Sequence, residues 1–518
     1  MDKTCGTRKA KRSALLFAVL LLLGSLFACH PNEEVSPAIT EHPTQQVEIT
    51  PTPELTPTAT AEVSPTPFDE TPYKGNGSKY VYTTTSARDR GWEEDIVYLA
   101  DTLLDPYSGH PKLTARGCSI SYLNGLKDGY EDVEYSFDSL YDAELHEEFL
   151  RRINALLQSI SEKSDEELLL GCAETVAILN DGHTYVEQYI LNEKTRVFPL
   201  GLIPIYTDGA MQAYIDSAPV GKEDLLLCRL DAINGVPLSE VIEAYGRIVS
   251  HENMNLVEYY ALNYTSIYLD SELLNCAFLR YYGFMGQESS AVFSITDETG
   301  VARDVTLSSV SLRDYPSMVY YYPSTEPEED VALWKGVSGN VWYEFLDGGK
   351  TFYFRIRRCS DSSDEQVRAA LEEAKRSGTV EKVILDFRGN GGGNLATKGE
   401  IVKAVESIEA PGGKYVLVNG GSYSAAVLIP VALRRFCTDV VLVGQPAGMP
   451  PNGAFGAGAE LYSPNQHIIG GYAVRDRYYS WPGNDDPALM PDIIIYQTLE
   501  DYKNGIDTVL NVLLNGSD

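Results

Sequence analysis

The sequence KYVLVNGGSYSAAVLIPVALR, from Lys414 to Arg434, decides the fold because its structural character changes at its centre. It begins as a short apolar, β-branched run typical of a buried strand, and its apolar residues from Ser424 onward have helical spacing. The polar turn NGGSYS between them places the Ser424 hydroxyl at a helix N-terminus, where free N–H groups and the helix dipole favour negative charge. The turn therefore predicts a site suited to an alkoxide or an oxyanion, although serine is also a common N-cap residue.

A second strand that breaks into glycines lies upstream, in the sequence VILDFRGNGGGN from Val383 to Asn394. Strands and helices alternate around both stretches, which predicts an α/β fold with a mostly parallel sheet. Functional loops of such sheets gather at the carboxyl ends of the strands, so we expect the glycine loop and the serine turn to lie together. The expected elements are strand 351–357, a helix opened by Ser363-x-x-Gln366 and ended by Gly378, strand 382–387, helix 395–407, strand 415–418 and strand 440–444.

Glycines allow a backbone to turn several N–H groups toward one point. The amide of Gly391, Gly392 or Gly393, together with the amide of Ala425, is therefore predicted to form an oxyanion hole beside Ser424. A phosphate cradle is the rival interpretation. The loop lacks the third glycine of a dinucleotide fingerprint and the Gly-Lys-Ser/Thr of a P-loop, so we expect no nucleotide cofactor.

Composition limits the classes of partner. The 41 basic and 74 acidic side chains give a formal net charge of −33, which argues against a nucleic-acid partner. The 518 residues exceed what one core usually holds, so we expect two or three domains with appendages. The cysteines after Cys29 lack metal-ligand and CxxC spacing, which predicts buried thiols and no zinc site. They are Cys118, Cys172, Cys228, Cys276, Cys359 and Cys437.

The N-terminus has the pattern of an export signal. Basic residues precede an apolar run from Ser13 to Phe27, which is short for a membrane span. The sequence LFAC ending at Cys29 resembles a bacterial lipoprotein cleavage box, which predicts a signal peptide at 1–28, a lipid on Cys29 and an extracytoplasmic protein. Ordinary secretion or an uncleaved anchor is the alternative. Residues 29–79 are rich in Pro, Thr and Glu without an apolar period, which predicts a disordered tether.

An N-terminal helical domain is predicted at 80–194, with amphipathic helices at 93–104, 140–161 and 164–179. The third helix opens with a capping box and ends in the turn NDGHT, which carries His183. A histidine in a turn is usually a surface or packing residue. Residues 195–320 contain a strand, an Asn-Gly turn and a helix from Ser239. This pattern is typical of a PDZ-like α+β segment, which would bind an extended peptide.

Three stretches together carry a family resemblance: ILDFRGNGGG from Ile384, VLVN through SAA from Val416, and VLVGQP from Val441. They resemble the tail-specific, or C-terminal processing, serine proteases, strongly over the last third of the chain and loosely elsewhere. The resemblance implies a crotonase-like α/β catalytic core at 331–518, an exported endopeptidase that acts on polypeptides, and a nucleophile at Ser424. Ser422 is the alternative nucleophile.

One departure from the family concerns the base. Many members use a Ser-Lys dyad, but Gly444 is followed by QPAGMPPN, without a lysine. A serine hydroxyl without a base is a poor nucleophile at neutral pH. The turn around His183 is similar to a segment of tricorn-like relatives in which a distant histidine reaches the nucleophile, so His183 is the expected general base and His467 its competitor.

The acid that orients this base is poorly determined by the sequence. Asp485 and Asp486 occupy the late position at which the tricorn-like arrangement contributes its acid, although either could be a turn residue. Asp386 and Arg388 are interpreted mainly as structural.

Two functions follow from these patterns. The first is an extracytoplasmic serine endopeptidase without cofactor or metal, and the second is a catalytically silent peptide- or ligand-binding lipoprotein on the same fold. A surface spacer without a site would leave the paired glycine and serine loops unexplained.

Overall fold

A computed structural model gives the three-dimensional arrangement of the chain. The described residues are 86–122, 133–137, 139–187, 195–207, 209–263, 272–315, 319–321, 339–378, 380–393, 398–437, 439–479, 481 and 484–516. The predicted signal peptide, the predicted tether and Cys29 lie outside them. Within the described part of the chain, no helix combines the length and the apolar character needed to cross a bilayer.

The C-terminal part of the chain is built on a six-stranded sheet with the order β13-β14-β15-β16-β17-β20. Strand β13 is antiparallel to β14, and all the following pairs are parallel. The strands are β13 (Val341–Leu346), β14 (Thr351–Ile356), β15 (Lys382–Asp386), β16 (Lys414–Val418), β17 (Val440–Gly444) and β20 (Ile493–Ile494).

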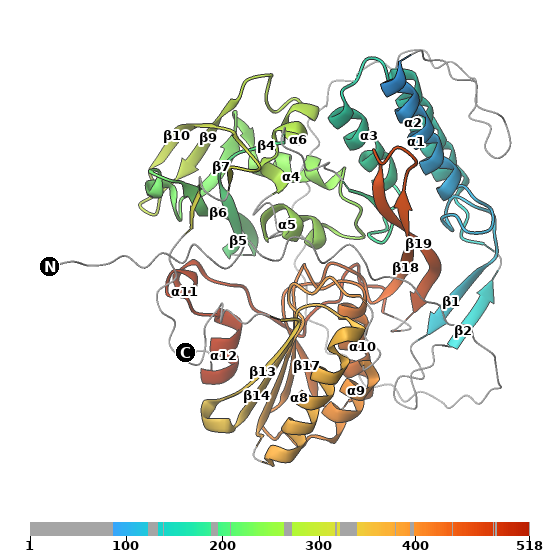
Figure 1. Cartoon of the computed structure of the whole chain (residues 1–518). Helices are drawn as coiled ribbons and strands as arrows, with labels where there is room; N and C mark the ends of the chain where they lie inside the picture. Colours follow the sequence, from blue (N-terminus) through green and yellow to red (C-terminus); the bar gives the residue numbers. More distant parts are fainter. Residues whose placement is uncertain are drawn as a thin grey trace, which may run out of the picture. The chain divides into compact units, whose positions relative to one another are not determined.

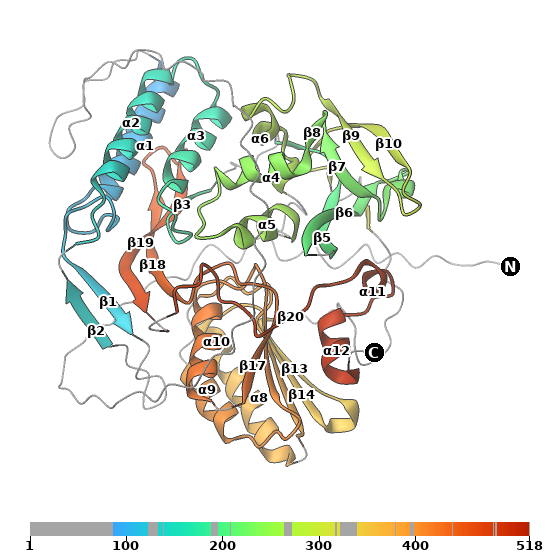
Figure 2. The same ribbon diagram turned by 180° about the vertical axis from the view of Figure 1, so that it is seen from behind.

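Helices cover both faces of this sheet (Figures 1 and 2). One face packs against α8 (Asp364–Ser377), α9 (Lys398–Ser407) and α10 (Ala425–Phe436), and the other against α12 (Thr508–Asn515). Successive side chains of a strand point to opposite faces, so in β15 Val383 and Leu385 join the first cluster and Ile384 joins the second. Burial on both faces explains why these strands are continuous apolar runs.

One predicted helix start is wrong in detail. Ser363 does not cap α8 through its side chain, because it ends a short 3-10 turn, Asp361–Ser363, with near-helical angles of φ −97° and ψ −7°. Gly378 ends the helix as expected, in the left-handed region at φ 60°.

The N-terminal part contains three helices, α1 (Ala87–Leu103), α2 (Ala143–Ser159) and α3 (Asp165–Ala177). Helix α3 opens with the predicted capping box: the Ser164 hydroxyl accepts from the amide of Glu167, and the Glu167 carboxylate accepts from the amide of Ser164. Trp92, Phe149 and neighbouring apolar residues form the core between these helices.

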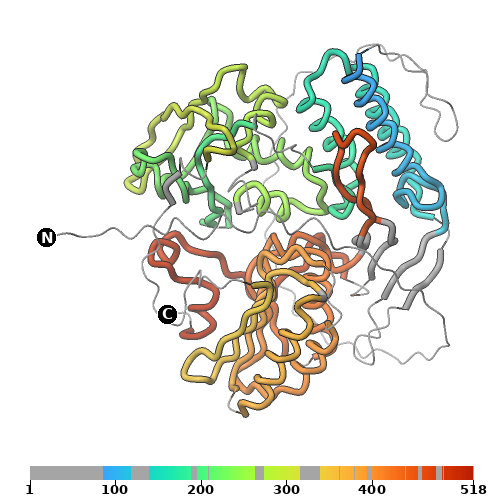
Figure 3. The backbone as a smooth tube through the Cα atoms, viewed as in Figure 1, coloured from blue at the N-terminus to red at the C-terminus, as the bar shows by residue number. Residues whose placement is uncertain are grey.

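A hairpin from the C-terminal third reaches this helical part. Strands β18 (Asn452–Tyr462) and β19 (Ile469–Tyr479) join β1 (Cys118–Tyr122), β2 (Val133–Phe137) and β3 (Tyr185–Val186) in a five-stranded sheet. In Figure 3 the red hairpin lies beside the blue and teal helices. Asp95 of α1 accepts from the amides of Asn465 and His467, at 2.8 and 3.0 Å. Because β3 begins two residues after His183, its pairing with β19 ties the His183 turn to the C-terminal third.

The middle of the chain forms a seven-stranded antiparallel sheet. Its Asn234-Gly235 turn has positive φ at both residues, 50° and 80°, as a two-residue hairpin requires. The strands are β5 (Gly201–Thr207), β6 (Ala210–Pro219), β7 (Arg229–Ile233), β8 (Val236–Pro237), β9 (Ser290–Thr296), β10 (Ala302–Ser308) and β12 (Val319–Tyr321). The helices of this middle part are α4 (Leu238–Gly246), α5 (Met254–Asn263) and α6 (Cys276–Tyr281). It also contains the two-residue strands β4 (Arg196–Val197) and β11 (Val310–Ser311). The short helix α11 (Leu499–Lys503) lies near the C-terminal end of the chain.

Candidate active site

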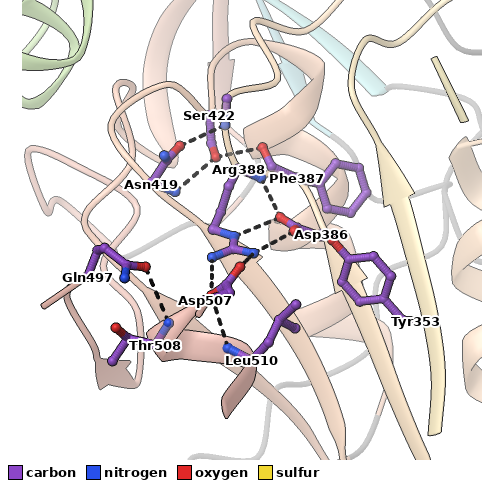
Figure 4. A network of polar contacts seen from close by, with 11 residues as sticks. Tyr353, Asp386, Phe387, Arg388, Asn419, Ser422, Gln497, Asp507, Thr508 and Leu510 are labelled. Carbon is purple, nitrogen blue, oxygen red and sulfur yellow. Dashed lines mark hydrogen bonds and ion pairs between the residues drawn. The ribbon is translucent and has the colours of Figure 1, made fainter. Parts of the chain in front are cut away.

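The serine turn after β16 is fixed by side-chain clamps (Figure 4). The Asn419 carboxamide oxygen accepts from the amides of Gly389 and Gly421, at 2.8 and 3.1 Å, and so joins the glycine loop to the serine turn. The Ser422 hydroxyl donates to the carbonyl of Phe387 at 2.9 Å and accepts from the amide of Asn419 at 3.0 Å. Ser422 is fully buried and committed to these two bonds, so it is not placed to attack a substrate.

Ser424 has a backbone conformation that side chains rarely adopt, with φ 52° and ψ −124°. Its hydroxyl makes no capping bond to α10, so the simple N-cap interpretation does not hold. Non-glycine residues in such regions cost roughly 1–3 kcal/mol each and occur at functional sites. The half-buried Ser424 hydroxyl is therefore not used by its own helix.

The turn after α3 presents His183 to this hydroxyl, with 2.9 Å between His183 Nε2 and Ser424 Oγ. Asp181 shapes the turn: its Oδ1 accepts from the amide of His183 at 3.0 Å and its Oδ2 from the hydroxyl of Thr184 at 2.6 Å. The fully buried His110 lies behind, with Nε2 3.2 Å from Asp181 Oδ2.

A tyrosine links the imidazole to a second carboxylate. The Tyr423 hydroxyl lies 3.1 Å from His183 Nδ1 and donates to Glu252 Oε1 at 2.7 Å. A phenol has one proton. When the phenol donates its proton to Glu252, the bond between Tyr423 and His183 needs a proton from the histidine. Nδ1 of His183 must then be protonated and donate to the Tyr423 oxygen. The lone pair of Nε2 then faces Ser424, as a general base requires.

Opposing effects act on the charges of this cluster. Burial lowers the pKa of His183, but Asp181, by hydrogen bonding and charge, and the charge of Glu252 outweigh it, so the pKa is raised overall. Burial raises the pKa of Glu252 to about 7, assisted by the charge of Asp181 and opposed by His183 and Tyr423. Burial also opposes ionisation of Asp181, yet bonds from His110 and His183 hold its pKa below the usual value. Asp181 is therefore the permanent negative charge near the imidazole.

The glycine loop passes very close to Ser424. A Cβ added to Gly392 would lie 2.6 Å from the Ser424 Cβ, and Gly392 has φ 91°, so only glycine fits. Its amide donates to the Asn390 carboxamide oxygen at 2.9 Å, so Gly392 is not free to donate to an oxyanion as predicted. Its carbonyl accepts from the amide of Cys359, so the trans peptide points the N–H of Gly393 away from Cys359.

Two backbone donors near Ser424 have no protein acceptor in the described part of the chain, the amides of Ala425 and Gly393. The amide of Gly391 also has no protein acceptor in that part of the chain, and both Gly391 and Gly393 are exposed. The arrangement can thus offer two N–H groups to an oxyanion, with Gly393 in place of Gly392.

A buried ion network holds the start of the glycine loop (Figure 4). Arg388 pairs with Asp386 and with Asp507 of the α12 N-cap, each at 2.7 Å, and the Tyr353 hydroxyl donates to Asp386 at 2.6 Å. Burial opposes ionisation of Asp386, but the charges of Arg388 and Arg355 lower its pKa overall. These residues have the structural role expected for Asp386 and Arg388.

Three predicted alternatives lie elsewhere. Asp485 and Asp486 are exposed, and within the described part of the chain no hydrogen bond or ion pair joins either of them to His183, so they are not placed to orient it. His467 stacks on Trp92 with ring centroids 4.5 Å apart, and its Nδ1 lies 3.0 Å from Asp95, so it serves the hairpin contact instead.

No local pattern pointed to Glu252, which lies in an irregular segment between α4 and α5. Tyr423 was visible only as a turn residue. Their joint role depends on a contact between residues 171 positions apart.

Asp181, His183 and Glu252 are also the one described group of side chains close enough to hold a metal ion, with ligand atoms within 4.8 Å of one another. The Tyr423 hydroxyl, however, already bonds to the histidine and the glutamate of this group. The donor set therefore fits a hydrogen-bonded network that orients the imidazole better than it fits a metal ion.

The cysteines whose side chains are described are buried and free, as the sequence predicts; Cys118 is not among them.

Comparisons with known proteins support the fold. No protein-family model and no curated protein sequence matches the chain. Among solved structures, a mutant of CPAF is similar with a TM-score of 0.51 and 14% identity, covering 84% of this chain and 99% of that one. Mature CPAF has a TM-score of 0.50 and 13% sequence identity, over 81% of this chain and 95% of the CPAF chain. The photosystem II D1 C-terminal processing protease has a TM-score of 0.32 and 15% sequence identity, over 71% of this chain and 91% of that protein. At these identities the two CPAF matches show a shared α/β fold.

Proposed function

We propose that the chain is a serine endopeptidase that cleaves polypeptides by acyl transfer, with Ser424 as nucleophile and His183 as general base. The observation that carries the proposal is the 2.9 Å contact between Ser424 Oγ and His183 Nε2, made by a strained serine that does not cap its helix. A catalytic hydrogen bond needs roughly 2.6–3.2 Å, which includes this distance.

In the first half-reaction Ser424 Oγ attacks the carbonyl carbon of the peptide bond while its proton passes to His183 Nε2. The negative oxygen that develops accepts from the amides of Ala425 and Gly393. Preorganised donors of this kind each contribute roughly 3–4 kcal/mol to other acyl-transfer sites. The C–N bond then breaks, and the proton on Nε2 passes to the departing amine, leaving an acyl-serine.

In the second half-reaction a water molecule attacks the acyl carbon and gives a proton to Nε2. The carbon–Oγ bond breaks, and that proton returns to Oγ. Throughout, Nδ1–H of His183 donates to Tyr423, and Tyr423 donates to Glu252. This chain fixes the tautomer, while the charge of Asp181 stabilises the imidazolium. Tyr423 and Glu252 are thus positioning residues that act through His183.

At a finer level we assign the chain to the tail-specific protease family, near its tricorn-like members. The motifs at Ile384 and Val416 support this, and so does a base contributed from the N-terminal part of the chain. The parallel sheet with helices on both faces is compatible with a crotonase-like core, and the middle sheet with its Asn-Gly hairpin is compatible with a PDZ-like module.

A fluorophosphonate probe tests the chemistry, because it forms a covalent bond with an activated serine. We expect labelling of the full chain that maps to Ser424 by peptide mass, none in Ser424→Ala, and labelling at least roughly a hundredfold slower in His183→Ala. His467→Ala serves as a matched control and should label normally. Absence of labelling in folded protein, or labelling that survives Ser424→Ala, would refute the proposal, and the former would favour a silent binding protein.

For the location, the proposal is a lipid anchor on Cys29 and an extracytoplasmic catalytic part. The export pattern at 1–28 and the Pro/Thr/Glu-rich tether support it. Expressed in a bacterium, the full chain should be found in the membrane fraction and Cys29→Ala in the soluble export fraction. Equal membrane association of both would argue for an uncleaved anchor.

A further inference from the structure

A pocket lies beside the serine turn, between strand β5, helix α5 and the loop after β17. It is a small hollow of about 30 Å³ that is partly open to solvent. Neither Ser424 nor His183 lines it, and Gly420, four residues before Ser424, connects it to the serine turn. Its lining contains no Lys, Arg or His. The residues that define its chemistry are Tyr206, Glu258, Tyr259, Gln445 and Tyr496.

Glu258 is the charged group of this pocket. Its Oε2 accepts from the Tyr206 hydroxyl at 2.9 Å, and no ion pair to Glu258 is found in the described part of the chain. Burial raises the pKa of Glu258, and the Tyr206 bond only partly opposes this. A half-buried carboxylate without a cation is costly, and a positive ligand would remove that cost.

Aromatic rings form the walls around this carboxylate. Tyr206 and Tyr496 stack with centroids 4.2 Å apart and an interplanar angle of 20°. Tyr259 packs with its ring against Gly421, where an added Cβ would meet three ring atoms at 2.4–2.6 Å, so its position is fixed. Tyrosine faces attract cations, and planar guanidinium groups stack on them while pairing with a carboxylate.

The alternative occupant is an uncharged apolar side chain. It would leave the Glu258 carboxylate desolvated and without a cation, and it would make no hydrogen bond with Gln445, another polar residue of the lining. The net charge of −33 further favours the approach of cationic polypeptides.

We infer that this pocket binds a positively charged side chain, arginine in particular, of a polypeptide, with Glu258 as the specificity-determining residue and the tyrosines as its walls. The polypeptide class rests on the proposed function, whereas the affinity for the cation does not. A substrate anchored here would be held close to the turn that carries Ser424, so cleavage would favour polypeptides with an accessible basic residue.

The test separates binding from hydrolysis. The full chain with Ser424→Ala, which cannot turn over substrate, is titrated with two fluorescent ten-residue peptides that differ only in a central arginine or citrulline. Anisotropy should give at least roughly tenfold tighter binding of the arginine peptide, as expected for a charge-assisted pair. Adding Glu258→Gln should abolish this preference. Glu240→Gln, which removes one exposed charge on α4, should keep it.

Glu258→Gln removes a desolvated charge and keeps an acceptor for Tyr206, so it should fold; a thermal melt checks this. If it does not fold, Tyr496→Ala provides the second variant and should weaken arginine-peptide binding several-fold. Equal affinity for the two peptides, or an arginine preference that survives Glu258→Gln, would overturn the inference. Fluorophosphonate labelling of the chain with an intact Ser424 is independent of these outcomes, so failure of the pocket and failure of the proposed peptidase are distinguishable.

Discussion

Replacing Tyr423 by Phe tests whether the base is oriented through a tyrosine. The change removes one oxygen atom and keeps the ring, whose centroid lies 4.9 Å from that of the imidazole. Two hydrogen bonds are lost, the 3.1 Å contact to His183 Nδ1 and the 2.7 Å bond to Glu252. Packing of the buried ring should be unchanged, so an effect on rate reports on the hydroxyl.

The size of the effect follows from the remaining contacts. A hydrogen bond to a charged group contributes about 1.5–3 kcal/mol, so a rate loss of roughly 10- to 100-fold is expected when the imidazolium loses this partner. Enforcing the wrong tautomer costs other triads about 10⁴-fold. That larger loss is not expected, because Asp181 Oδ1 lies 3.7 Å from Nδ1 and still favours a proton there.

The assay is the rate of fluorophosphonate labelling across a pH series, together with kcat and KM for a fluorogenic polypeptide. The loss should be in kcat and in the labelling rate, with KM nearly unchanged. Tyr315→Phe is the matched control, because it removes another buried hydroxyl, bonded to the Leu200 carbonyl at 3.3 Å away from the site. Labelling of Tyr423→Phe at the unmodified rate would refute the role of Tyr423 in orienting His183.

The remaining predictions concern the same cluster. Glu252→Gln should lower the pKa of His183, since the charge of Glu252 raises it, and so move the acid limb of the labelling–pH profile to lower pH; a limb that stays or moves up contradicts this. Burial raises the folded-state pKa of Glu252 to about 7, so the folding stability of the unmodified protein falls as pH rises from the unfolded pKa toward 7. Relative to the unmodified protein, Glu252→Gln should therefore gain at most about 3 kcal/mol of unfolding free energy at pH 8 and little at pH 4, measured by denaturant unfolding. Gly392→Ala should reduce labelling at least roughly a hundredfold, since the new Cβ would displace Ser424; normal labelling would mean that the loop adapts. Ser422→Ala should destabilise the fold by about 1–3 kcal/mol in urea but still label, whereas complete loss of labelling in folded protein would indicate a catalytic Ser422.

Local pattern was sufficient for the elements that carry the site. The apolar run before Asn419 and the helical spacing after Ser424 correspond to β16 and α10, and Val440–Gly444 is a strand with the expected bounds. Strands buried on both faces and glycine-ended helices leave such signals in contiguous residues, because backbone hydrogen bonding and side-chain alternation act over a few positions.

Other features needed contacts between distant residues. No local pattern distinguishes Ser422 from Ser424. The Ser422 hydroxyl donates to the Phe387 carbonyl, whereas the Ser424 hydroxyl makes no capping bond to its helix. Gly392 is a glycine for steric reasons, and only the Asn390 side chain shows that its amide is already bonded.

By itself the sequence determined an α/β core with a serine and a glycine loop at neighbouring strand ends, and it nominated His183 as a base. Only the tertiary structure decided that this imidazole lies 2.9 Å from Ser424 and that its other nitrogen faces Tyr423 and Glu252. The physical reason is that the pKa values and tautomers of these groups depend on burial and on charges within a few ångströms, and chain folding brings together groups from segments up to 241 positions apart.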